Sequence, residues 1–133
     1  MKIHPKRLGD IAEIIFLLRC MALGLVVARP YGDCDPFDFI VYSPFTQRML
    51  RVQVRCSASI NNYTYSVQAR MRGSARRYTR KTLDLMAVYV LPHNAWYIIP
   101  VEKLKGSRVC CSPHLKTSNR WTERYREAWH LLM

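Results

Sequence analysis

The chain has 133 residues, of which 50% are hydrophobic and 23% are charged. This length and composition favour a single folded domain over residues 1–133 and exclude a disordered chain of low hydrophobicity. The 21 Lys and Arg residues outnumber the 9 Asp and Glu residues, which gives a formal net charge of +12. Because a domain this basic usually has an anionic partner, most commonly nucleic acid, we expect a nucleic acid as the partner.

The cysteines and the N-terminal apolar run bear on metal content and location. The five cysteines include no Cys-x-x-Cys pair, which excludes the common zinc-ribbon and zinc-finger patterns. Free thiols are typical of a reducing, intracellular setting, so we expect a cytoplasmic protein. The apolar run at residues 11–28 contains Glu13 and Arg19, and each charge would cost about 2.5–3.5 kcal/mol at the centre of a membrane span. We therefore expect a buried helix and no membrane partner.

The first predicted element is a helix over residues 9–23, because apolar residues recur there at helical spacing. Gly24 is a typical residue for ending it. A short strand is expected at residues 25–28. A loop follows at residues 30–36, which is dense in Pro, Gly and Asp.

The middle of the chain predicts a sheet. Strands at residues 37–42 and 49–55 are separated by a short turn and should form a β-hairpin. Another short strand is expected at residues 63–67. The continuous apolar run at residues 83–91 is typical of a strand that is buried on both faces, and residues 95–100 return as a further strand.

The last part of the chain is predicted to form a loop at residues 105–119 and then an amphipathic helix. The helix is expected from an apolar stripe at helical spacing, made of Trp121, Tyr125, Ala128, Trp129 and Leu132. The order of elements predicts an α/β fold in which a mixed central β-sheet is flanked by an N-terminal and a C-terminal helix.

Four residues with acidic, amide or cationic side chains follow one another in an order that suggests a metal site. Glu13 lies in the first helix, Asp38 in a Pro-x-Asp sequence at the start of a strand, and Gln53 and Arg55 on the next strand. Strand periodicity points Gln53 and Arg55 the same way, and the hairpin brings them beside Asp38. Oxygen ligands beside a cation can hold a divalent metal ion and activate water against a phosphodiester.

This order resembles the PD-(D/E)xK nuclease superfamily, in particular its small archaeal-resolvase-like and homing-endonuclease-like members, whose third motif can read Gln-Val-Lys. The resemblance extends over about residues 9–104 and includes the helix opening at residues 9–13, the loop at residues 29–33, and the strands at residues 84–90 and 96–100. It implies a restriction-endonuclease-like core and a metal-dependent DNA endonuclease that hydrolyses phosphodiester bonds.

The resemblance also implies a role for each matching residue. Asp38 would be the metal-bridging carboxylate, Gln53 would bind Mg²⁺ or Mn²⁺ through its amide oxygen, and Glu13 would be an accessory ligand. Arg55 stands where the family has Lys. Because Arg keeps its proton near neutral pH, a general-base role is excluded, but its planar fork can bind a phosphate oxygen and stabilise developing negative charge. The neutral Gln53 and the fixed charge of Arg55 should both weaken metal binding or slow the reaction.

Two other functions stay open at this point. The chain could be a catalytically inactive nuclease fold that binds DNA without cutting it, or a basic interaction module of another class. Each of the four residues also has an ordinary structural reading: Glu13 as a partly exposed helix acid, Asp38 as a turn residue, and Gln53 with Arg55 as the solvated face of a strand.

A basic segment at residues 70–81 is the second candidate site. Together with the net charge of +12, it predicts contacts to the phosphates of duplex or junction DNA. The expected contact residues are Arg70, Arg72, Arg76, Arg77, Arg80 and Lys81. Because compact basic domains often act on duplex DNA as symmetric dimers, a homodimer is a further expectation.

Overall fold

The computed structural model describes residues 2–71 and 76–133. The chain starts with a long helix, α1 (Pro5–Ala22), and all later helices are short 3-10 turns. The strands in chain order are β1 (Val26–Ala28), β2 (Phe39–Ser43), β3 (Arg48–Ser57), β4 (Tyr65–Gln68), β5 (Leu85–Val90), β6 (Ala95–Pro100) and β7 (Arg108–Cys111). The 3-10 helices are η1 (Leu91–His93), η2 (Val101–Lys103), η3 (Trp121–Tyr125) and η4 (Trp129–Leu132).

Five strands form the central sheet, in the order β1-β2-β3-β5-β6. The β3–β5 pair is parallel and the other three pairs are antiparallel, so the sheet is mixed. Strands β4 and β7 form a separate antiparallel pair. These features confirm the expected α/β fold with a mixed central sheet and the predicted hairpin of β2 with β3.

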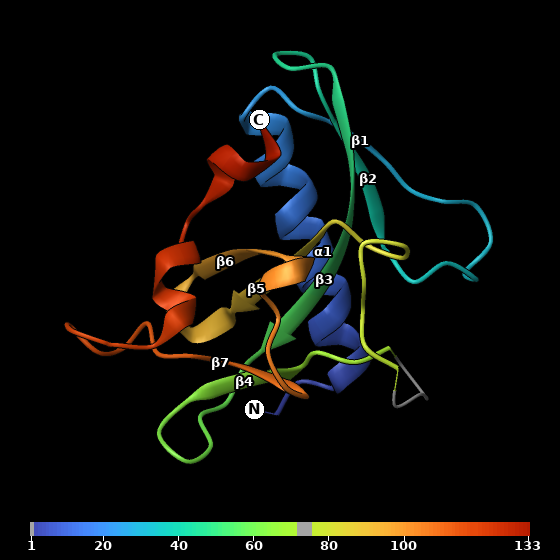
Figure 1. Cartoon of the computed structure of the whole chain (residues 1–133). Coiled ribbons are helices and arrows are strands. Elements are labelled where there is room, and N and C mark those ends of the chain that lie inside the picture. Colours follow the sequence, from blue (N-terminus) through green and yellow to red (C-terminus); the bar gives the residue numbers. More distant parts are fainter. Residues whose placement is uncertain (1, 72–75) are drawn as a thin grey trace.

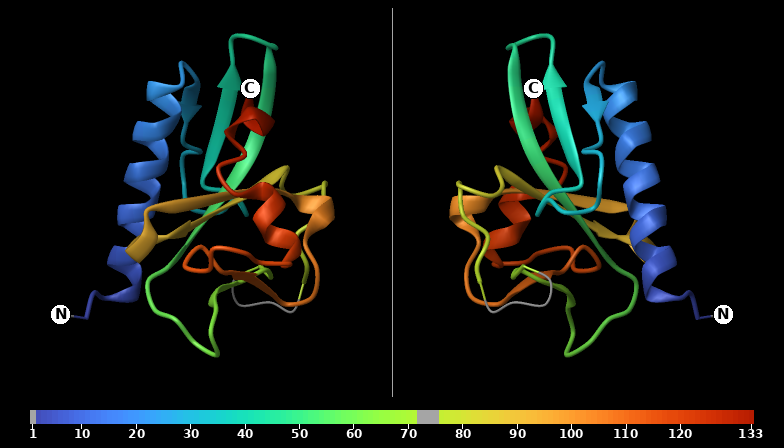
Figure 2. Two further views of the ribbon diagram at one scale, coloured as in Figure 1. Left: turned by 90° about the vertical axis from the view of Figure 1, so that its left-hand side faces the viewer. Right: turned by 90° about the vertical axis from the view of Figure 1, so that its right-hand side faces the viewer.

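Two hydrophobic layers hold the sheet between α1 and the β4–β7 pair. On one side, Ala12 and Phe16 of α1 pack in the same cluster as Val54 of β3. On the other side, Val67 of β4 packs in the same cluster as Val88 of β5. All six residues of β5 are buried, as the continuous apolar run predicts for a strand covered on both faces. Figure 1 shows α1 running alongside β3, and in Figure 2 α1 forms one flank of the molecule.

The predicted C-terminal helix is wrong. Residues 121–132 form the two short 3-10 helices η3 and η4 instead of one amphipathic helix. Glu127 lies between them with a φ of 52°, a left-handed conformation that a continuous right-handed helix cannot contain. Its carboxylate fixes the break, because it accepts hydrogen bonds from the backbone N–H of Trp96 at 3.0 Å and from Nε1 of Trp129 at 2.7 Å.

Other boundaries also differ from the sequence-based expectations. Strand β7 lies inside residues 105–119, where a loop was expected, because Arg108–Cys111 pairs with β4 some forty residues earlier. Helix α1 begins at Pro5, four residues before the expected start, and the side chain of His4 caps it by accepting a hydrogen bond from the N–H of Lys6 at 3.2 Å. Within the part of the chain that the structure describes, no helix is long and apolar enough to span a bilayer.

Candidate active site and nucleic-acid interface

Asp38 immediately precedes β2, and two hydrogen bonds fix it against β3. Its backbone N–H donates to the carbonyl of Val52 at 2.9 Å, and its Oδ2 accepts from the backbone N–H of Val54 at 2.8 Å. Burial raises the pKa of the Asp38 carboxyl above its ordinary value, against the opposing effects of the Val54 hydrogen bond and of the Arg55 charge. The carboxylate therefore occupies a fixed, partly desolvated position beside the middle of β3.

Gln53 and Arg55 point to the face of β3 that lies away from α1. The parallel register pairs them with Met86 and Val88 of β5, which belong to the hydrophobic layer on that face. Val54, which separates them, packs in the layer of α1. In the described residues the Gln53 side chain has no hydrogen-bond partner, so its amide oxygen is available to a ligand.

The segment that follows β4 holds the guanidinium of Arg55. Its Nη2 donates to the hydroxyl of Tyr78 at 2.7 Å and to the backbone carbonyl of Arg70 at 3.4 Å. Its Nε is buried and has no hydrogen-bond partner among the residues that the structure describes. The charge of Arg55 lowers the pKa of Asp38, yet in the described part of the chain the two side chains form no ion pair. Arg55 therefore lies near the carboxylate without binding it.

Glu13 lies on α1 and forms an ion pair with Arg29, which follows β1. Burial raises the pKa of the Glu13 carboxyl, Asp38 raises it further, and Arg29 opposes both effects. Because the charge of Asp38 raises the pKa of Glu13, the two carboxylates lie within electrostatic range of each other. An open pocket of about 440 Å³ adjoins Glu13 and is also lined by Asp10, Arg29 and Phe39.

The four sequence-predicted residues thus occupy one region, although among the described residues no hydrogen bond or ion pair joins any two of them directly. Asp38 is linked electrostatically to both neighbours, because its charge raises the pKa of Glu13 and the charge of Arg55 lowers the pKa of Asp38. Gln53 precedes Val54, whose N–H holds Asp38. The arrangement puts two carboxylates, an amide and a guanidinium around the start of β2.

The donor atoms of this region fit a hard divalent cation. One oxygen of Asp38 carries no hydrogen bond within the described residues, Gln53 offers an amide oxygen, and Glu13 offers a second carboxylate; Mg²⁺ and Mn²⁺ prefer such oxygens. The described residues contain no group of three or more His, Cys, Asp or Glu side chains that could hold a metal. A set with so few carboxylates should bind a cation more weakly than one built from three acids.

The basic segment 70–81 lies next to Arg55. Arg72 falls outside the described residues. Arg70 and Arg77 form an isolated β-bridge. Tyr78, which follows Arg77, is buried. Among the described residues of the segment, the exposed cations are Arg76, Arg77, Arg80 and Lys81. The segment thus presents cations to solvent while one of its side chains, Tyr78, reaches into the candidate active site.

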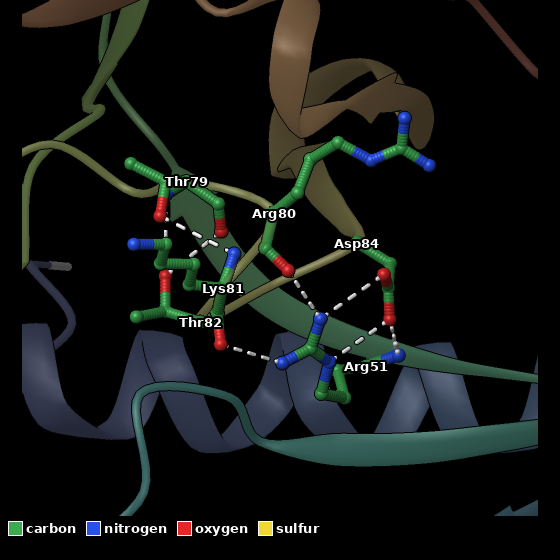
Figure 3. A network of polar contacts seen from close by, with 6 residues as sticks. All are labelled: Arg51, Thr79, Arg80, Lys81, Thr82 and Asp84. Atoms are coloured by element: carbon green, nitrogen blue, oxygen red, sulfur yellow. Dashed lines mark hydrogen bonds and ion pairs between the residues drawn. The ribbon is translucent and has the colours of Figure 1, made fainter.

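An arginine of β3 fixes the turn that carries Arg80 and Lys81 (Figure 3). Arg51 forms an ion pair with Asp84, with 3.0 Å between Nε and Oδ2, and its backbone N–H donates to the same oxygen at 2.8 Å. The guanidinium also donates to the backbone carbonyls of Arg80 at 2.6 Å and Lys81 at 2.9 Å. Burial alone would raise the pKa of Asp84, but the hydrogen bonds from the Arg51 side chain and backbone hold it below its usual value.

Sequence reasoning missed three residues that shape this region. Arg29 and Tyr78 lie in segments without regular secondary structure, where no periodicity predicts the direction of a side chain. Arg51 had one available signal, because strand alternation places it on the same face as Gln53 and Arg55. Its partner Asp84 immediately precedes β5, and only the parallel register of β3 with β5 brings the two together.

Comparisons with known proteins agree with this architecture. Among solved structures, the bacterial homing endonuclease I-Ssp6803I is similar with a TM-score of 0.81 and 29% identity, over 96% of this chain and 91% of that one. Hjc, a Holliday junction resolvase from the archaeal hyperthermophile Archaeoglobus fulgidus, is similar in fold, with a TM-score of 0.50 and 16% identity over 80% of this chain and 84% of that one. Among curated proteins, none matches the chain.

These likenesses confirm the expected restriction-endonuclease-like core. A family model described as PD-(D/E)XK endonuclease matches residues 3–132. Since this match extends over nearly the whole chain, and the mixed sheet with its N-terminal helix is the fold of two nucleases, the chain belongs to the PD-(D/E)XK endonuclease family.

Proposed function

We propose that this protein hydrolyses phosphodiester bonds of DNA with the help of Mg²⁺ or Mn²⁺ held near Asp38. The observation that carries the proposal is the Asp38 carboxylate, which is fixed by the N–H of Val54 and lies beside an Arg55 that does not pair with it. A carboxylate kept partly desolvated, with one oxygen unengaged within the described residues, suits a hard cation. Membership of the nuclease family supports the same reaction class.

Asp38, Gln53 and Glu13 are the residues that would hold the metal. When bound, the ion supplies a Lewis acid for the phosphate and lowers the pKa of a bound water. Glu13 already pairs with Arg29, so it would have to share its carboxylate, which fits an accessory role better than a bridging one. Arg55 cannot act as the base. Its guanidinium would bind a phosphate oxygen and offset the negative charge that develops in the transition state.

The exposed cations of the basic segment are proposed to bind the DNA backbone. Arg76, Arg77, Arg80 and Lys81 are exposed, and Arg51 ties the turn that carries the last two to the central sheet. Four phosphate contacts would give log affinity a slope of about −3.6 against log salt, from about −0.9 per contact. One structural neighbour is a homing endonuclease and the other a Holliday junction resolvase, so both duplex and four-way-junction DNA are substrates to test.

The test compares the wild-type chain with Asp38→Asn and with Asp35→Asn, an exposed acid of the same loop that serves as the matched control. Each protein is incubated with plasmid, linear duplex and a four-way junction, in Mg²⁺, in Mn²⁺ and in EDTA. Wild type and Asp35→Asn should cleave at least one substrate, whereas Asp38→Asn should lose activity by about a hundredfold, or ~2.7 kcal/mol of transition-state stabilisation. Equal cleavage by wild type and Asp38→Asn would refute the proposed site.

A second candidate is a nuclease-fold protein that binds DNA without cutting it. Gln53 and Arg55 favour it, because they replace an acid and a lysine of the family pattern. The double substitution Gln53→Glu with Arg55→Lys should then create cleavage where wild type has none, while DNA affinity in EDTA stays within about threefold of wild type. A wild-type chain that cleaves as fast as the double variant contradicts this second candidate.

The proposed partner is DNA in the duplex or junction form, bound by a homodimer whose two sites face the two strands. Sedimentation of the chain with and without a duplex measures the number of copies bound. A strictly one-to-one complex at saturating protein would contradict the dimer.

A further inference from the structure

The guanidinium of Arg55 bonds to a neutral phenol although a carboxylate lies nearby. Its Nη2 donates to the hydroxyl of Tyr78 at 2.7 Å, and it forms no ion pair with Asp38 within the described residues. Carboxylates are the stronger acceptors for a guanidinium and can bind it through two parallel hydrogen bonds. The structure must therefore contain a feature that keeps the Arg55 side chain from pairing with Asp38.

Tyr78 has the geometry to do this. Only 6% of the residue is exposed, and it belongs to the hydrophobic layer between the central sheet and the β4–β7 pair. The Arg55 guanidinium carbon lies 6.0 Å from the centre of its ring, so both the hydroxyl and the ring engage the cation. Burial raises the pKa of Tyr78, which keeps the phenol neutral, and its oxygen accepts from Arg55. The adjacent bridge between Arg70 and Arg77 fixes the backbone on either side.

In its present position Arg55 leaves one of its donors without a partner among the described residues. This donor is the buried Nε, and an unsatisfied donor on a charged group is costly. The guanidinium would gain by reaching the oxygen of Asp38 that carries no hydrogen bond. That oxygen is also the one available to a cation, so an Arg55–Asp38 ion pair and a bound metal ion would compete for the same acceptor.

We propose that Tyr78 is a positioning residue that holds Arg55 away from Asp38 and so keeps the Asp38 carboxylate open for the divalent cation. The inference rests on the proposed function in one respect, namely that Asp38 binds metal. An arginine at position 55 could pair with Asp38 and block it, because the charge of a guanidinium is permanent and its planar fork matches a carboxylate. Tyr78 would prevent this pairing. With Tyr78 as its acceptor, Arg55 stays available for the phosphate.

The test is calorimetric titration of the metal-free 133-residue chain with Mn²⁺, in the absence of DNA. Tyr78→Phe keeps the ring and removes the hydroxyl, so the fold should persist, which circular dichroism checks. Its Mn²⁺ affinity should fall at least tenfold. The matched control is Tyr65→Phe, which removes the hydroxyl of another buried tyrosine in the same layer, one that contacts His93 instead of Arg55. This control should bind Mn²⁺ as wild type does.

A second pair of variants separates positioning from packing. In an Arg55→Met background no guanidinium remains to compete for Asp38, so adding Tyr78→Phe should leave the Mn²⁺ affinity unchanged. A tenfold loss that persists in this background would overturn the inference, because it would mean that Tyr78 acts through packing. Equal affinities of wild type and Tyr78→Phe would also overturn it while leaving the metal site intact. A wild-type chain that binds no Mn²⁺ would instead refute the proposed metal site, and the role of Tyr78 with it.

Discussion

Replacing Asp84 with Ala would remove the carboxylate, just before β5, that anchors Arg51 of β3. That carboxylate accepts three hydrogen bonds from Arg51: from the backbone N–H at 2.8 Å, from Nε at 3.0 Å and from Nη2 at 3.2 Å. The side chains are only 31% and 24% exposed, so solvent screens the pair incompletely. Since hydrogen bonds to charged groups contribute about 1.5–3 kcal/mol, we expect Asp84→Ala to lower the free energy of unfolding by about 2–3 kcal/mol.

This contribution should depend on pH in a defined direction. The pKa of Asp84 is lowered in the folded state, so the carboxylate stabilises the fold at pH values above the unfolded pKa of about 3.9. The stabilisation is lost as the pH falls through the lower, folded-state pKa. The difference between wild type and Asp84→Ala should therefore be full at neutral pH and should shrink in strong acid.

Urea unfolding followed by circular dichroism at neutral and at acid pH measures both effects. At neutral pH a loss of this size corresponds to a fall in Tm of about 6–12 °C for a chain of this length. Asp35→Ala, which removes an exposed acid from a loop, is the matched control and should change stability by less than about 0.5 kcal/mol. If Asp84→Ala is as stable as this control, the Arg51–Asp84 ion pair does not anchor the turn.

Three further predictions concern DNA binding, metal binding and the core. Arg80→Ala and Lys81→Ala should each reduce the steepness of the salt dependence of DNA binding by about 1. Lys116→Ala, in the loop after β7, is the control and should leave that slope unchanged. An unchanged slope in all three variants would contradict a contact between DNA and these two residues. Because burial raises the pKa of Asp38, protons compete with the metal ion for its carboxylate, and on acidification Mn²⁺ affinity should begin to fall at a higher pH than for an exposed aspartate. Calorimetry over a pH series tests this. An affinity that does not change with pH would argue against Asp38 as a ligand. Phe16→Ala should lower the free energy of unfolding, measured in urea, by about 3–5 kcal/mol, since Phe16 is fully buried against three aromatic rings. A loss under 1 kcal/mol would mean that neighbouring side chains close the cavity left by the missing ring.

The strands of the central sheet were predictable because burial leaves a pattern in the sequence. The alternation in β3 and the continuous apolar run of β5 each follow from the faces that those strands bury. Strand β7 has only four residues, and its pairing with the distant β4 decides its conformation. Such a short segment carries no pattern that distinguishes a strand from a loop.

The C-terminal aromatic stripe predicted burial correctly and backbone conformation wrongly. Trp129 is buried in the core and Trp121 packs against the second hydrophobic layer, as a core-facing stripe requires. The backbone between them is broken at Glu127, because its side chain binds Trp96 and Trp129. Those bonds depend on β6 lying alongside, and helical periodicity contains no information about them.

The order of Glu13, Asp38, Gln53 and Arg55 led to the nuclease family, which the family match then confirmed. Their individual roles remain predictions. The pattern could not give the pairing of Glu13 with Arg29 or of Arg55 with Tyr78. In each contact one partner, Arg29 or Tyr78, lies in a segment without regular secondary structure, where no periodicity indicates the direction of a side chain.

The manner in which Arg51 holds its turn has a consequence for how this protein can change. Its guanidinium grips main-chain oxygens at positions 80 and 81, not the side chains found there. The contacts that Arg51 makes are therefore independent of which side chains stand at positions 80 and 81. New residues introduced at these two places would alter what the surface offers to a nucleic acid while the scaffold beneath stays the same, so the turn is a natural site for redesigning substrate preference.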